Sequence, residues 1–195
     1  MEKEVVHHVV EFLIDTGAFD PSRVNENVLK DLGIIDDENA LNRKEIRSGA
    51  PGAYFAFTNT TKDKIEVRPE KIVINSKTIE RINFIHSRLS DYYNSVKIYD
   101  VIYITDYHIF GDKRPFEVIN SYSNIPGLKL DVVRYVYDET LVTMYICLEQ
   151  KLHFHLSSTV TKDKLFADID FEEYSEIDNK FREFVNNQLK LNYEN

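Results

Sequence analysis

The sequence predicts an α+β domain in which helices pack on one face of an antiparallel sheet. Three observations indicate this class: alternating apolar residues in several runs after position 53, segments whose apolar residues recur every three or four positions, and turn residues between them. A chain of 195 residues can bury a sizeable core without disulfides or metals, so we expect positions 1–195 to form a single domain. Its predicted parts are a helical start at about 1–35, a loop at about 36–52, and a sheet with helices at 53–195.

The front of the chain is predicted to hold two short helices. Apolar residues in positions 6–13 follow the i, i+3, i+4, i+7 spacing of a helical face. Because this segment is rich in β-branched valine, a strand over 4–14 is the alternative. Asp20 and Pro21 have the residue types preferred as N-cap and first helical residue, and Gly33 is the expected stop.

The middle of the chain alternates between strand and helix patterns. The polar stretch 36–52 ends in Ser-Gly-Ala-Pro-Gly and is predicted to be a loop. Pro69 cannot donate to an interior ladder, so the strand pattern around it is expected to fold there. The predicted elements after the loop are strands at 53–58 and 64–75, a helix from Ile79, and a strand at 97–105.

The second half begins with a predicted loop at 111–127 and continues into the most regular part of the sequence. A strand at 130–137 is expected to turn at Asp138 and Glu139 into a long strand over 142–156, whose apolar residues share one parity. Another strand at 165–171 and a final amphipathic helix follow. Thr-Lys-Asp-Lys occurs at both 61–64 and 161–164, which is explained either by a duplicated ββα unit or by coincidence.

Composition and charge exclude several classes of function. The single Cys147 rules out an internal disulfide and a multi-cysteine zinc site, and it favours a reducing compartment. We expect a cytoplasmic protein, since there is neither a secretory signal nor an apolar run long enough to span a membrane. The net charge of -9 repels phosphate backbones, so nucleic acid is not an expected partner. No cofactor is expected, because the sequence has no glycine-rich phosphate loop.

Histidine and aspartate form two candidate sites. His153 and His155 would face one side of a strand, and a hairpin near 161–164 would bring Asp168 and Asp170 opposite them. Such a group is either a divalent-metal site or an ordinary set of cross-strand polar pairs. In the second candidate site, Asp106 and His108 lie at the end of the predicted strand 97–105, where an aspartate could orient a histidine general base.

The abundant tyrosines provide a third candidate site. Tyr135, Tyr137 and Tyr145 lie on neighbouring predicted strands, and we interpret them either as a partner-binding surface or as the rim of the core.

The end of the chain resembles a broad group of bacterial SecB-like proteins. The resemblance is carried by Lys164-Leu-Phe-Ala-Asp-Ile-Asp-Phe-Glu-Glu-Tyr with the helix that follows it, and by the hairpin at Arg68-Pro69-Glu70; together these cover about a third of the chain. It implies an antiparallel sheet backed by helices and a chaperone-like or antitoxin-like role in binding polypeptides. The chain departs from secretory SecB because its predicted first helices precede the sheet.

The sequence therefore predicts a non-enzymatic interaction module from a bacterium or phage that binds a protein partner through its sheet face and loops. A homo-oligomer is one form that this binding could take. The alternative is a metal-dependent hydrolase or nuclease that uses the histidines and aspartates.

Overall fold

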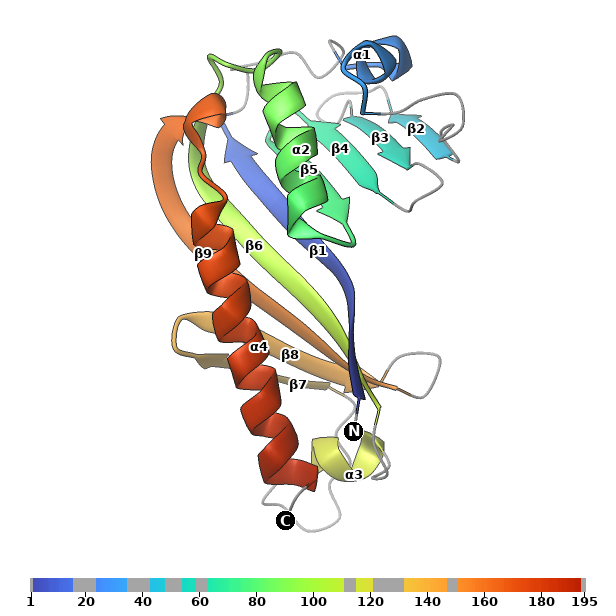
Figure 1. Ribbon diagram of the computed structural model, residues 1–195, viewed down its shortest axis with the longest axis vertical. Coiled ribbons are helices and arrows are strands. Elements are labelled where there is room, and N and C mark those ends of the chain that lie inside the picture. Colours follow the sequence, from blue (N-terminus) through green and yellow to red (C-terminus); the bar gives the residue numbers. More distant parts are fainter. Residues whose placement is uncertain are drawn as a thin grey trace. The chain divides into compact units, whose positions relative to one another are not determined.

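A computed structural model describes residues 2–15, 24–34, 43–47, 54–58, 63–110, 115–120, 132–146 and 151–193. The described strands form one sheet in the order β2-β3-β4-β5-β1-β6-β9-β8-β7 (Figure 1). The strands are β1 (Glu2–Ile14), β2 (Arg43–Arg47), β3 (Tyr54–Thr58), β4 (Lys64–Arg68), β5 (Lys71–Ser76), β6 (Lys97–Phe110), β7 (Val132–Tyr137), β8 (Thr140–Ile146) and β9 (Leu152–Leu165). The helices are α1 (Glu26–Asp31), α2 (Ile79–Ser90), α3 (Pro115–Asn120), α4 (Glu172–Tyr193) and the 3-10 helix η2 (Phe166–Asp168). The predicted α+β class is confirmed.

The order of elements repeats along the described chain. Strand β1 has 13 residues and is followed by the six-residue α1, antiparallel strands and α2; strand β6 has 14 residues and is followed by the six-residue α3, antiparallel strands and α4. The strand order repeats as well, since β5, β4, β3 and β2 follow outward from β1, while β9, β8 and β7 follow outward from β6. Each repeat therefore has a long strand and a short helix before its antiparallel strands and final helix, and so contains more elements than the ββα unit that the sequence suggested. The Thr-Lys-Asp-Lys echo does not mark it, because residues 161–164 lie inside β9 whereas Lys64 begins β4.

The residues divide into two compact units, which are described separately. Unit 1 comprises Met1–His7, Ile104–Ser158 and Glu172–Asn195, and unit 2 comprises His8–Tyr103 and Thr159–Phe171.

Unit 2 is built on α2 and the strands beneath it. The Thr78 side chain caps α2 by accepting a hydrogen bond of 3.2 Å from the Arg81 amide. Register pairs Phe12 with Ile72 and therefore places both on one face of the sheet, where they are fully buried. Burying one such side chain contributes about 1.5–3 kcal/mol. The helix adds His86 to this core, where its ring lies among Phe12, Phe166 and Phe171.

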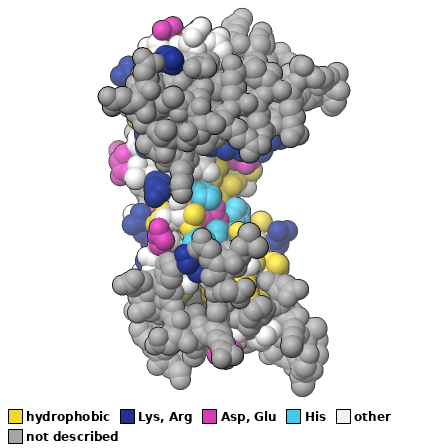
Figure 2. Space-filling view, turned by 90° about the vertical axis from the view of Figure 1, so that its right-hand side faces the viewer, with side chains coloured by type: hydrophobic (Ala, Val, Ile, Leu, Met, Phe, Trp, Pro, Cys, Tyr) yellow, Lys and Arg dark blue, Asp and Glu magenta, His cyan; other side chains and the backbone are white. Residues whose placement is uncertain are grey.

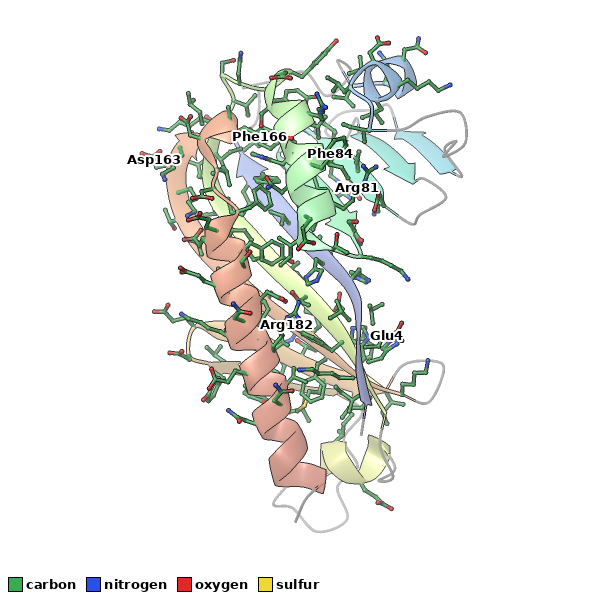
Figure 3. All side chains as sticks on the ribbon, viewed as in Figure 1. Glu4, Arg81, Phe84, Asp163, Phe166 and Arg182 are labelled. Atoms are coloured by element: carbon green, nitrogen blue, oxygen red, sulfur yellow. The ribbon has the colours of Figure 1, made fainter. Side chains whose placement is uncertain are left out.

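His86 is held in its apolar surroundings by one hydrogen bond. Its Nε2 lies 2.8 Å from the carbonyl oxygen of Phe166 and donates to it, and Phe166 lies close to α2 (Figure 3). Burial lowers the pKa of His86 to about 4, although the bond to Phe166 acts in the opposite direction. The ring is therefore neutral in the folded protein at neutral pH.

Unit 1 is organised by α4. Its buried residues recur at helical spacing and include Tyr174, Ile177, Phe181 and Phe184. The Tyr174 hydroxyl donates to the carbonyl of Ile104 at 2.6 Å and so ties the start of the helix to β6.

A buried carboxylate strengthens the contact between α4 and β6. Asp178 accepts hydrogen bonds from Thr105 at 3.0 Å, from the Tyr107 hydroxyl at 3.2 Å and from Nε of Arg182 at 2.6 Å; Arg182 projects from α4 (Figure 3). Burial raises the pKa of Tyr107 well above its ordinary range, and the charge of Asp178 raises it further. Tyr107 therefore keeps its proton at neutral pH and donates to Asp178.

The structure corrects the prediction for the front of the chain. Residues 4–14 belong to β1 and not to a helix, because the stiff β-branched valines fit a paired strand and β5 supplies the partner. The predicted start at Asp20 and Pro21 lies outside the described residues, and α1 uses Asn25 as its N-cap. Gly33 follows the helix with φ of 67°, which confirms it as the stop.

Two strand predictions in the second half are also wrong. The expected strand over 142–156 is two strands, since β8 ends at Ile146 and Leu152 of β9 pairs back with it. Strand β9 then continues through 161–164, where a hairpin was expected, and ends at Leu165. The expected strand at 165–171 contains η2 instead, because the chain turns inward to bury Phe166, whose amide donates to the carbonyl of Val96 at 2.8 Å.

The two predicted loops each contain a regular element. Strand β2 lies within 36–52 and pairs with β3, and α3 lies within 111–127. Pro115 is the first residue of α3, where its missing N–H removes no helical hydrogen bond. The other residues of both segments lie outside the described part of the chain.

Candidate functional site

A buried carboxylate in unit 1 contacts three imidazoles from two other strands. Asp106 on β6 has only 4% of its surface exposed and lies next to His7 of β1 and to His153 and His155 of β9. These four residues are called the histidine cluster below. Because side chains alternate along a strand, Asp106 points away from the face on which its neighbours Thr105 and Tyr107 contact α4.

Both oxygens of Asp106 are used. Oδ1 lies 2.8 Å from Nε2 of His153 and 2.8 Å from Nδ1 of His155, and Oδ2 lies 2.7 Å from Nε2 of His7. These distances are those of short hydrogen bonds to an ionised acceptor. His153 is buried, whereas about a third of the side chain of both His7 and His155 is exposed.

The cluster sets both the charge of the aspartate and the tautomers of the histidines. Burial by itself raises the pKa of Asp106, but the hydrogen bonds from His153, His155 and His7 outweigh it and hold this pKa well below the ordinary value. An ionised carboxylate can only accept hydrogen bonds. Each histidine therefore carries a proton on the nitrogen that meets Asp106, namely Nε2 of His7, Nε2 of His153 and Nδ1 of His155.

Two aromatic contacts surround His153. The ring of Tyr145 on β8 stacks on it with centroids 4.5 Å apart, and the ring of His108 meets it edge-on at 5.1 Å. Tyr145 is also the cross-strand partner of His153 in the β8–β9 register. The histidine cluster thus has rings above and beside its most buried imidazole, which restricts the motion of that imidazole.

The same face of the sheet carries exposed apolar side chains on β7 and β8. Arg134 pairs with Thr143, and Thr143 pairs with His155, so alternate residues of β7 lie on the side of the histidines. These are Val132, Arg134 and Val136, with Leu141 opposite Val136. The exposed fractions are 52% for Val132, 70% for Val136 and 36% for Leu141, and Arg134 is exposed as well. We call these four residues the β7 patch. Figure 2 shows histidines grouped with acidic and hydrophobic side chains on one face.

The structure brings together two candidate sites that the sequence kept apart. Asp106 and His108 were predicted as one pair and His153 and His155 as half of another, and all four residues meet in unit 1. Asp168 and Asp170 do not take the expected places opposite the histidines on a hairpin. Asp168 ends η2, Asp170 follows it, both are exposed in unit 2, and the carboxylate partner of the histidines is Asp106.

The three predicted binding tyrosines do not share a face. The rings of Tyr135 and Tyr137 contact Phe184 of α4 with centroids 6.3 and 5.1 Å away, respectively. Tyr145 points to the opposite side and stacks on His153. Tyr145 therefore belongs to the candidate site, whereas Tyr135 packs under α4 and Tyr137 lies at its edge.

Sequence reasoning missed the role of His7 and the pairing of Asp106 with the histidines of β9. His7 was expected on a helix, where it would have had no strand neighbour. The available signal was that Asp106, His108, His153 and His155 all occupy alternate positions between apolar residues. Recognising it required the strand order, which places β6 between β1 and β9.

The chemical capacity of the cluster follows from these bonds. One nitrogen of each of the three imidazoles is engaged with the carboxylate, and among the described residues no group of three or more His, Cys, Asp or Glu is arranged to hold a metal ion. Within the described part of the chain, no helix is long and apolar enough to cross a membrane.

No protein-family model matches the chain, and no curated protein matches it. Among solved structures, the chain is similar to Methanococcus jannaschii TBP, with a TM-score of 0.39 and 14% sequence identity over 97% of this chain and 99% of that chain.

Proposed function

We propose that the chain is a non-enzymatic interaction module and that it binds a polypeptide partner through the β7 patch. The observation that carries the proposal is the exposure of three aliphatic side chains on one face of two paired strands: Val132, Val136 and Leu141. Val136 and Leu141 are cross-strand partners, and Val132 lies on the same face beyond Arg134. Single exposed aliphatic residues are common, but several on one face beside polar residues are typical of a surface that another molecule covers.

The histidine cluster supports this role by stiffening the strands beside the patch. Asp106 links β1, β6 and β9 through side chains, in addition to their backbone pairing. Tyr145 of β8 extends this rigid group to the strand that carries Leu141. A rigid surface loses little conformational freedom when a partner binds, so more of the contact energy contributes to affinity.

The test compares substitutions at two exposed apolar side chains, one inside the β7 patch and one outside it. Val136→Ser acts in the β7 patch, and Tyr92→Ser removes a residue that is 43% exposed in unit 2. Proteins captured by the tagged wild-type chain from its source cells should be lost with Val136→Ser and kept with Tyr92→Ser. Equal capture by both variants would place the binding surface elsewhere and reject the proposal.

The fixed tautomers of the cluster favour one second candidate, a metal-dependent hydrolase or nuclease. Asp106 orients His7 and His155 as an aspartate orients a catalytic imidazole, and both rings are partly exposed. A metal that binds only the folded chain must raise its melting temperature. Zn²⁺ or Mn²⁺ would have to stabilise the chelator-treated wild type and not the His153→Ala/His155→Ala variant. No shift with either ion would remove this candidate.

A further inference from the structure

We infer that the partner presents an acidic residue flanked by aliphatic residues two positions away on either side, in an extended segment that lies along β7. This inference rests on the proposed function and names the chemistry of the partner. It is carried by the order of side chains on β7, by their exposure and by the charge of Arg134 between the two valines.

The spacing of the patch follows from strand geometry. Val132, Arg134 and Val136 are every second residue of β7, so they point the same way at intervals of about 7 Å. Another extended segment has the same period and can place its own alternate residues opposite them. A sequence of the form aliphatic-x-acidic-x-aliphatic then puts aliphatic residues on Val132 and Val136 and the acid on Arg134. Leu141 widens the apolar contact at one end, since it pairs with Val136.

The positive charge of Arg134 favours an acidic over a basic residue at the central position of the partner segment. The whole chain carries a net charge of -9. The neighbours of Arg134 on this face nevertheless carry no carboxylate: across the sheet they are Thr143 and then His155, and along β7 they are Val132 and Val136. Arg134 is exposed, and its Nε is held by a 3.3 Å hydrogen bond to Thr143. An acidic side chain there meets an oriented guanidinium, whereas a basic one meets repulsion.

The turn of the β7–β8 hairpin disfavours a second acidic residue at one end of the bound segment. Asp138 and Glu139 form the exposed turn between β7 and β8, just beyond Val136. They would repel a second acid placed past the aliphatic residue that covers Val136. The preferred segment therefore has its acid at the centre and no further acid at the end that faces the turn.

Three synthetic peptides that differ only at the centre test the inference. Each has the sequence Ser-Leu-Ser-X-Ser-Leu-Ser with blocked ends, where X is Glu, Gln or Lys, and binding is followed by the shifts of backbone amide signals of β7 and β8. We expect the Glu peptide to bind about fivefold more tightly than the Lys peptide, as a single exposed charge contact allows. Arg134→Glu should reverse this order, whereas Arg88→Glu makes the same charge change on α2 and should preserve it.

The outcomes separate the inference from the proposed function. If Val136→Ser weakens all three peptides equally but the peptides show no order by charge, the patch binds apolar segments and the acidic preference is wrong. If no peptide perturbs β7 or β8, both the preference and the peptide-binding surface are rejected. A dimer in sedimentation that Val136→Ser dissociates would show that a second copy of the chain occupies the patch, which also overturns the inference.

Discussion

At the residue scale, Asp106 joins side chains from three strands of unit 1. It accepts three hydrogen bonds, and its pKa lies below the ordinary value. Because the unfolded chain binds the proton more readily, this group stabilises the fold above about pH 4, and its contribution falls as the pH drops below that value. The cluster therefore behaves as a structural link at neutral pH.

Replacing Asp106 with Asn should destabilise the protein strongly. The new amide group keeps one acceptor oxygen but turns an NH₂ group toward imidazoles that already donate, so at least one buried polar group loses its partner. We expect the free energy of unfolding at pH 7 to fall by about 2–4 kcal/mol, measured by urea denaturation. Asp168→Asn, at an exposed position, should change it by less than about 0.5 kcal/mol. If Asp106→Asn lowered the free energy of unfolding as little as Asp168→Asn, the histidine cluster would not stabilise the fold.

His86 should make the protein sensitive to mild acid. Its pKa is about 4 in the folded chain, below the ordinary 6.5, so the unfolded chain binds a proton first as the pH falls. The stability that this residue contributes is therefore complete above about pH 6.5 and is lost between there and pH 4, by about 3 kcal/mol in total.

The variant His86→Gln tests this sensitivity because its amide can still donate to the carbonyl of Phe166 but does not titrate. Urea denaturation at pH 7 and pH 4.5 should show a smaller loss on acidification than in the wild type. His86→Leu serves as a control that removes the hydrogen-bond donor. It should lower the free energy of unfolding at both pH values, and it should also reduce the loss of stability between pH 7 and pH 4.5. If both variants lost as much stability on acidification as the wild type, His86 would not be the source of the acid sensitivity.

At the scale of elements, the turn between β7 and β8 stores backbone strain. Asp138 has φ of 45° and Glu139 has φ of 64°, the left-handed values of a two-residue hairpin turn. Aspartate tolerates this region better than glutamate does, and glycine adopts it freely. Glu139→Gly should raise the free energy of unfolding by about 0.5–1 kcal/mol in urea denaturation. Glu139→Ala keeps the strain and should not stabilise, so a gain of equal size from alanine would rule out this explanation.

Elements with strong local signals were predicted well from the sequence. The helix from Ile79 has a clear apolar period, and the break at Pro69 and the turn at Asp138 and Glu139 each depend on a few neighbouring residues. The segment 4–14 was not predicted well, because valines at positions 5, 6, 9 and 10 satisfy a helical spacing and a strand composition together. Only the pairing with β5 decides between them, and no local pattern contains that information.

At the scale of the whole molecule, acid should affect the two units in sequence. His86 lies in unit 2 and loses its contribution between about pH 6.5 and 4, whereas Asp106 lies in unit 1 and loses its contribution only below about pH 4. Hydrogen exchange at pH 4.5, corrected for intrinsic rates and compared with pH 7, should show a larger loss of protection in α2 than in α4. His86→Gln should remove the difference. Equal loss in both helices of the wild type would contradict this order.

The candidate site could be predicted only in fragments. The residue types and their alternation identified Asp106, His108, His153 and His155, but the carboxylate partner was assigned by assuming that neighbours in sequence are neighbours in the sheet. Asp168 follows His155 closely along the chain, whereas Asp106 lies on an earlier strand that the sheet order places beside β9. The SecB-like resemblance, the single domain, the cytoplasmic location and the oligomer stay predictions.

The division into units has a practical consequence for locating any activity. Each unit is assembled from separate stretches of chain, with the seven N-terminal residues and the C-terminal helix both contributing to unit 1. No contiguous fragment contains all of unit 1 without also containing unit 2, so a terminal deletion removes part of the histidine cluster or the helix that packs behind it. Loss of binding in a shortened chain would thus report unfolding, and only single substitutions in the intact polypeptide can assign a role to a surface.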